Sequence, residues 1–92
     1  MIIEVALFGF RNDVDAARAA LLGLIREKQP YWKMEHKRRK DGTSGWTEEN
    51  PCVHWIITIT EDLTVGEVLR QIDALNFGFV LGTDCRACQN KI

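Results

Sequence analysis

With 92 residues, 46% of them hydrophobic, and only two prolines, the chain has room for one compact core but not for two independent domains. A formal net charge of −1 gives no general attraction to nucleic acid or to an anionic membrane surface. The start MIIEVALFGF lacks the features of a secretory signal, and the cysteine count of three is odd, so we expect a cytoplasmic protein without a disulfide framework.

The first half of the chain predicts a strand, a helix and a second strand. Residues 2–10 (IIEVALFGF) are rich in β-branched and aromatic side chains, which is typical of a buried central strand. From Asn12, a favourable N-cap, apolar residues recur at helical spacing until Pro30 ends the helix. Residues 31–40 (YWKMEHKRRK) then alternate between apolar and polar types, and their lysines and arginines suit an exposed sheet edge.

The second half predicts two more strands with a helix between them. A glycine-containing loop leads to residues 52–60 (CVHWIITIT), whose alternation indicates another central strand. Thr64 and Glu67 form the capping-box pattern Thr-x-x-Glu, so a helix should begin directly after Thr64, and Asn76 is a suitable left-handed stop. Residues 77–83 (FGFVLGT) predict the last strand.

The resulting order, β-α-β-β-α-β, predicts an α+β fold of the ferredoxin-like type. Two right-handed split β-α-β units would combine into a two-layer sandwich, in which an antiparallel sheet with strand order 4-1-3-2 is covered by two helices. Residues 1–84 are expected to form this single domain, and residues 85–92 a C-terminal tail.

The sheet face without helices should expose apolar side chains. If the inward positions of the strands face the helices, five residues point away from them: Ala6, Phe8, Phe10, Ile56 and Val80. Such a cluster on a central sheet is typical of an association surface, and homodimerisation through this face is the simplest interpretation.

A second candidate contact region combines the basic run with the loop tryptophan. Lys37, Arg38, Arg39 and Lys40 follow one another, and Trp46 lies in the next loop. Trp46 either folds back as a plug or is displayed as an interface anchor. We expect these residues to bind a protein partner, and phosphate contacts to a nucleic acid are the alternative.

The predicted topology resembles that of the RNA recognition motif, in which aromatic side chains on the two central strands stack on bases. Phe8 could stand for one of these. The segment PCVHWIITI, however, offers His54 and Ile56 in place of the basic-glycine-aromatic signature, so the resemblance extends to topology only.

Four possible zinc ligands occur in two pairs. Cys85 and Cys88 form a C-x-x-C pattern, and Cys52 and His54 stand two residues apart on the third predicted strand. If the fourth strand ran parallel to the third along the whole sheet, the two pairs would lie at opposite ends, so we expect no shared ion within one chain. Two C-x-x-C tails meeting in a zinc-linked dimer remain an alternative. Cys52 and His54 are not expected to form a catalytic pair, since no third residue evidently orients the imidazole of His54.

No glycine-rich phosphate loop or catalytic signature is present, and no cofactor is expected. The sequence thus favours a non-enzymatic protein-binding module. A small inhibitor or adaptor, such as a phage or mobile-element product acting on a bacterial nucleic-acid-processing complex, has this size and character. A nucleic-acid-binding protein and a zinc-linked dimer are the alternative hypotheses.

Overall fold

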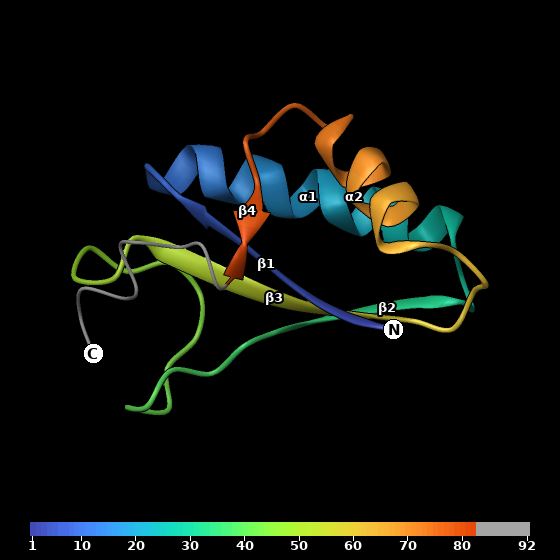
Figure 1. The fold of residues 1–92 in the computed structure, drawn as a ribbon. Helices are drawn as coiled ribbons and strands as arrows, with labels where there is room; N and C mark the ends of the chain where they lie inside the picture. Colours follow the sequence, from blue (N-terminus) through green and yellow to red (C-terminus); the bar gives the residue numbers. More distant parts are fainter. Residues whose placement is uncertain (83–92) are drawn as a thin grey trace.

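Six regular elements are found in the computed structural model, which describes residues 1–82 (Figure 1). In chain order they are β1 (Ile2–Phe8), α1 (Arg11–Glu27), β2 (Trp32–His36), β3 (Cys52–Ile59), α2 (Val65–Asp73) and β4 (Val80–Leu81). The predicted α+β class and the order of the elements are confirmed. Neither helix of this part of the chain has the length and apolar character needed to cross a membrane.

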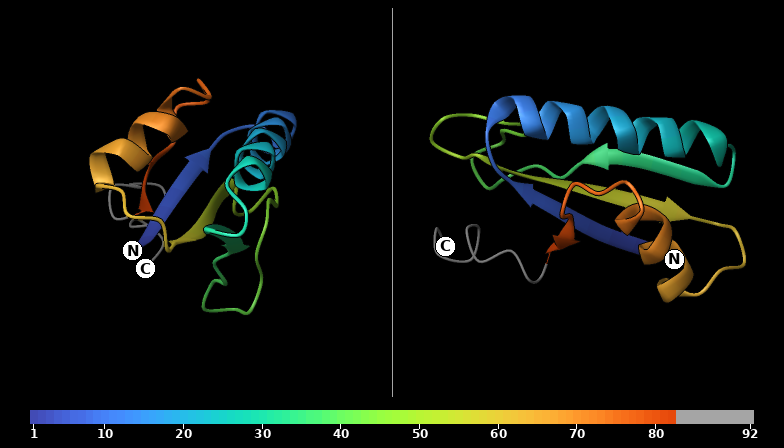
Figure 2. Two further views of the ribbon diagram at one scale, coloured as in Figure 1. Left: turned by 90° about the vertical axis from the view of Figure 1, so that its right-hand side faces the viewer. Right: turned by 90° about the horizontal axis from the view of Figure 1, so that it is seen from above.

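The four strands form one antiparallel sheet in the order β2-β3-β1-β4. Read from the opposite edge, this is the predicted order 4-1-3-2. Both helices lie on the same face of the sheet, and no helix of the described chain lies on the other face (Figures 1 and 2). The arrangement is compatible with a ferredoxin-like sandwich, and it leaves one sheet face open.

The core lies between the helices and the inner face of the sheet. Four alternating residues of β3 face the helices and are all buried: Val53, Trp55, Ile57 and Ile59. They pack with buried side chains of the two helices, among them Leu21 of α1 and Ile72 of α2. Because burial stabilises by about 25 cal/mol per Å² of apolar surface, this inner packing fixes which face of the sheet remains outside.

The start of α1 differs from the prediction. Phe10, with φ −71° and ψ 152°, is the N-cap, and its carbonyl oxygen accepts the first helical hydrogen bond from Val14 N at 3.0 Å. No side chain caps this helix. The choice of Asn12 was wrong because the turn after β1 is complete at Phe10, so that Arg11 already has helical geometry.

The start and stop of α2 agree with the predicted signals. Thr64 is the N-cap, and its Oγ1 accepts a hydrogen bond from Glu67 N at 3.1 Å. After the helix, Asn76 has a φ of 62°, which lies in the left-handed region. Local side-chain chemistry is therefore sufficient to bound this helix.

β2 is an edge strand, as predicted, but it is shorter than residues 31–40. It ends at His36, and one further backbone hydrogen bond joins Lys37 N to His54 O at 3.0 Å. Most of the basic run therefore lies in the loop after β2 rather than on the strand.

β4 is also much shorter than the predicted strand of residues 77–83. It contains only Val80 and Leu81, which pair with Ala6 and Val5 near the middle of β1. Gly78 has a φ of 78°, a conformation that interrupts an extended run. Thr83 lies outside the described residues.

Candidate functional site

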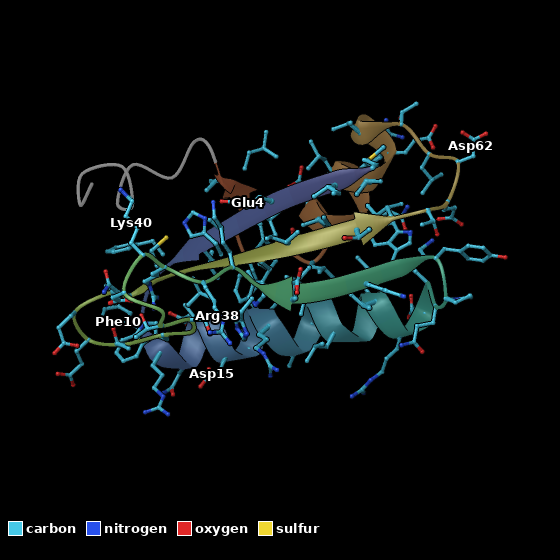
Figure 3. The ribbon with its side chains drawn as sticks, turned by 90° about the horizontal axis from the view of Figure 1, so that it is seen from below. Glu4, Phe10, Asp15, Arg38, Lys40 and Asp62 are labelled. Atoms are coloured by element: carbon cyan, nitrogen blue, oxygen red, sulfur yellow. The ribbon has the colours of Figure 1, made fainter. Side chains whose placement is uncertain are left out.

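The open face of the sheet carries exposed apolar side chains. Phe8 is 61% exposed and Val80 is 43% exposed, whereas Ile56 is half-buried between its neighbours. Phe10, just beyond the end of β1, is 80% exposed (Figure 3). These residues lie on the outer side or at its end, where they are accessible to another molecule.

Ala6 is the exception on this face, because its side chain is fully buried. Ala6 pairs with His54 on one side and with Val80 on the other, and these larger neighbours flank its single methyl group. The expectation that Ala6 is exposed is therefore wrong.

Arg39 holds the loop before β3 together. Its guanidinium donates hydrogen bonds to Thr43 Oγ1 at 3.1 Å, and to the carbonyl oxygens of Gly45, Asn50 (3.2 Å) and Cys52 (2.9 Å). A side chain with so many internal acceptors is not available to a partner without breaking the loop. Among the four residues of the predicted basic site, Arg39 has a structural role.

Arg38 and Lys40, in contrast, are exposed, and neither forms a hydrogen bond or ion pair with another residue of the described range 1–82. Figure 3 shows both near the same end of the open face as Phe10, while Asp62 lies at the opposite end. The accessible part of the basic run is thus two cations beside an aromatic side chain.

Lys37, Glu4 and His54 form a polar network on the open face. Lys37 Nζ donates to Glu4 Oε1 at 2.9 Å, and His54 Nδ1 lies 2.7 Å from Glu4 Oε2. Burial raises the pKa of Glu4, but the hydrogen bonds from Lys37 and His54 outweigh this effect, so that the pKa is lowered overall. Glu4 is therefore ionised at neutral pH and accepts from both neighbours.

Glu4 is the group that sequence reasoning missed. It pairs directly with Ile56 and reaches His54 along a diagonal of the β1–β3 ladder, and the register that creates this contact is not visible in the sequence. A carboxylate that accepts from Nδ1 fixes the orientation of the imidazole ring. Cys52 lies on the same face but is only 5% exposed.

Trp46 has the geometry of a folded-back side chain rather than a displayed one. It is half-buried, packs against the core, and donates from Nε1 to the carbonyl oxygen of Gly9 at 2.8 Å. This contact attaches the loop to the end of β1.

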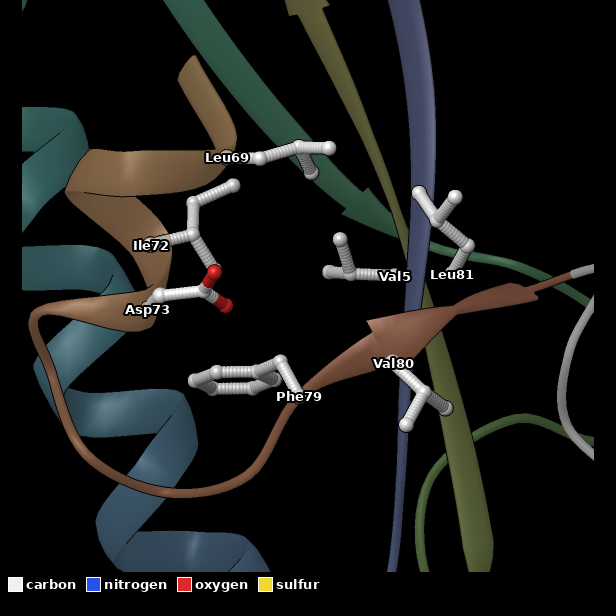
Figure 4. A pocket seen from close by; sticks show the side chains of 7 residues that line it. All are labelled: Val5, Leu69, Ile72, Asp73, Phe79, Val80 and Leu81. Carbon is white, nitrogen blue, oxygen red and sulfur yellow. The ribbon is translucent and has the colours of Figure 1, made fainter. Parts of the chain in front are cut away.

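A cavity of about 170 Å³ lies between α2, β1 and β4 (Figure 4). Its wall is apolar except for Asp73, and the other lining residues are Val5, Leu69, Ile72, Phe79, Val80 and Leu81. A single carboxylate at an apolar wall gives no convergent set of polar groups for a specific ligand.

Cys85 and Cys88 lie outside the described residues. Within residues 1–82, no group of three His, Cys, Asp or Glu side chains could hold a metal ion. The described part of β4 runs parallel to β3, as predicted, and ends where Leu81 pairs with Val5, which in turn pairs with Trp55. The prediction about the place of the C-x-x-C pair lies outside the described residues.

Comparison of the chain with protein-family models, with curated proteins and with solved structures gives no significant match. The functional argument therefore depends on the geometry of the molecule.

Proposed function

We propose that this chain is a non-enzymatic, ferredoxin-like binding module that contacts another protein, in the cytoplasm, through the open face of its sheet. The observation that supports the proposal is the exposure of Phe8 and Phe10 on or beside a face that carries no helix. Aromatic side chains supply large contact area at low entropic cost and are enriched at interface hot spots.

The charges around these aromatic residues favour a partner with acidic side chains. Lys33 lies on the outer side of β2 and is exposed, and Arg38 and Lys40 are accessible at the end of the face. A partner that offers an apolar pocket with a carboxylate rim would complement both features. Homodimerisation through this face is less favourable, because it would bring the basic groups of two copies together.

Nucleic acid is a weaker candidate than the sequence alone indicated. Each phosphate contact requires an available cation, and Lys37 is paired with Glu4 while Arg39 is committed to the loop. The remaining cations give a shallow electrostatic footprint.

We propose an inhibitor or adaptor that occupies the surface of a larger complex, such as a phage or mobile-element product acting on a bacterial nucleic-acid-processing machine. The small size of the chain and its lack of a catalytic signature support this setting.

The proposal is tested by affinity capture from a cell extract with three immobilised proteins: the wild type, Phe8→Asp and Val65→Asp. Val65 is a matched control, since it is an exposed apolar residue in the first turn of α2, where an acidic side chain suits the helix. We expect the same protein to bind to the wild type and to Val65→Asp, and to be lost from Phe8→Asp. Nuclease treatment should leave the capture unchanged.

Equal capture by Phe8→Asp would exclude the open face as the binding surface. Loss of capture after nuclease treatment, with a steep decrease between low and moderate salt, would favour nucleic-acid binding instead. Circular dichroism of all three proteins shows whether each variant keeps its fold.

A further inference from the structure

We propose that the outer edge of β2 binds an extended acidic segment of the partner protein, which adds to the sheet as a further strand. This contact rests on the proposed protein-binding function, but it lies on the sheet edge rather than on the open face. The two surfaces can therefore be tested separately.

β2 turns half of its backbone groups away from the sheet. At one end of the strand Thr60 N donates to Tyr31 O at 2.9 Å. Beyond the other end Lys37 N donates to His54 O at 3.0 Å. The odd-numbered residues of β2 are thus the ones that hydrogen-bond to β3. Because backbone groups alternate in direction along an antiparallel strand, those of the even-numbered residues point to the outer edge.

Met34 and His36 form the accessible part of this edge. Both residues are half-buried, whereas Trp32 is fully buried, so that its backbone cannot be reached. Within residues 1–82, no group is hydrogen-bonded to the outward N–H and C=O of Met34 or His36. An unpaired edge of this kind is a template for another strand, and strand addition gains its affinity from main-chain hydrogen bonds.

Two cations flank the edge on the helix side of the sheet. Burial lowers the pKa of His36, and the positive charge of nearby Arg18 on α1 lowers it further. At the other end of β2, Lys28 Nζ lies 5.7 Å from the ring centroid of Trp32. Figure 3 shows β2 as the outermost strand, alongside α1. A segment that pairs with β2 therefore runs past both cations.

The other side of the edge is also mainly basic. Lys33 is exposed on the outer side of β2 and forms no ion pair with another residue of the described chain, while Glu35 is the one acidic residue of this strand. Acidic side chains on either side of an added strand thus meet a cation. Lysine at a sheet edge discourages pairing with other strands, and here it favours an acidic one. A second copy of β2 fits less well, because it brings the same cations together.

Hydrogen exchange of the wild type, with and without a blocked octapeptide of alternating glutamate and valine, tests the pairing. At a peptide concentration about ten times its Kd, the amides of Met34 and His36 should exchange about tenfold more slowly, since only the unbound protein leaves them open. A matched peptide of alternating lysine and valine should not slow them. No slowing with the acidic peptide, or equal slowing with both, would overturn the proposal. Slowing that depends on protein concentration without any peptide would overturn it in favour of a second copy.

His36→Pro and His36→Ala separate the backbone hydrogen bond from the side chain. Proline removes an N–H that faces away from β3, and sheets tolerate proline at such edge positions. Relative to His36→Ala, His36→Pro should bind the acidic peptide about fivefold more weakly, because one main-chain hydrogen bond is lost. Equal affinities would contradict strand addition. Circular dichroism shows whether both variants are folded, and the exchange of the wild type decides the question if the proline variant is not.

Three further variants distinguish the edge from the open face. Arg18→Glu should weaken binding of the acidic peptide about fivefold, whereas Arg70→Glu, the same charge reversal on α2, should not. Phe8→Asp changes the open face and should leave peptide binding unchanged; its loss in this variant would contradict the edge as the site. A wild type that captures its protein partner through Phe8 but does not bind the peptide would refute strand addition and leave the proposed function intact.

Discussion

Arg39 and Arg38 are neighbours of the same type, yet their side chains have different roles. Arg39 bonds to three carbonyl oxygens and a hydroxyl group of the loop, while Arg38 is exposed. A guanidinium offers five N–H donors in a planar arrangement, so one side chain can join several parts of a loop that has no strand or helix of its own. The number of basic residues in the sequence therefore overestimates the number of cations that a partner can contact.

We predict that Arg39→Met lowers the free energy of unfolding by about 2 kcal/mol, because carbonyl oxygens that it satisfies lose a charged donor. Arg38→Met should change it by less than about 0.5 kcal/mol, as is usual for exposed positions. Urea unfolding of both variants measures the difference. Equal effects would mean that the loop does not depend on the Arg39 hydrogen bonds.

His36 makes stability depend on pH. Burial lowers its pKa from 6.5, and the positive charges of Arg18 and Arg39 lower it further. The folded protein therefore binds this proton less readily than the unfolded chain does, so its contribution to stability is full above pH 6.5 and is lost as the pH falls through 6.5 toward the folded-state pKa.

We accordingly expect the free energy of unfolding to decrease between about pH 7.5 and pH 5.5, and His36→Gln to reduce this decrease, since glutamine does not titrate. Urea denaturation at both pH values gives the two slopes. An unchanged slope in the variant would assign the pH dependence to other groups.

The features of helices and strands that the sequence predicts best are those that depend on residues close to one another in the chain. Thr64 and Asn76 bound α2 as predicted, and the alternation in β3 identifies its inner face. Strand ends are less predictable: β2 ends at His36, opposite Trp55, although β3 itself begins at Cys52. The contact between Glu4 and His54 depends on the register of two strands that are distant in sequence, and no local pattern encodes it.

The N-terminus of α1 presents a conflict between stability and exposure. Phe10 occupies the N-cap position without a capping group, although aspartate, asparagine, serine and threonine all suit this position better. Its ring is also among the most exposed apolar groups of the described chain. Phenylalanine at this position stabilises neither the helix nor the exposed surface. Its presence is explained if the ring contacts a partner.

Phe10→Asp should therefore raise the free energy of unfolding by about 1 kcal/mol while weakening capture of the partner protein. Asn12→Asp is the control, because it adds a charge to the first turn without supplying the cap, and it should stabilise less. Thermal unfolding and the capture experiment on both variants give the two readouts. If Phe10→Asp keeps full capture, the exposed ring has no role in binding.

The whole molecule is asymmetric in two directions. Its helices cover one face of the sheet, so the inward side chains of β1 and β3 are buried, and the outer face carries the polar network and the exposed aromatic residues. Across the sheet, β3 has neighbours on both sides, whereas β4 is an edge of two residues. The backbone amides of β3 should therefore be better protected from hydrogen exchange than those of β4.

In hydrogen exchange, we expect the amide of Ile57 to be among the slowest and that of Leu81 among the fastest of the strand residues. Ile57 is fully buried in a strand paired with both β1 and β2, so its exchange requires global unfolding, while Leu81 is exposed and opens locally. Similar protection of the two amides would show that the edge is held as firmly as the centre.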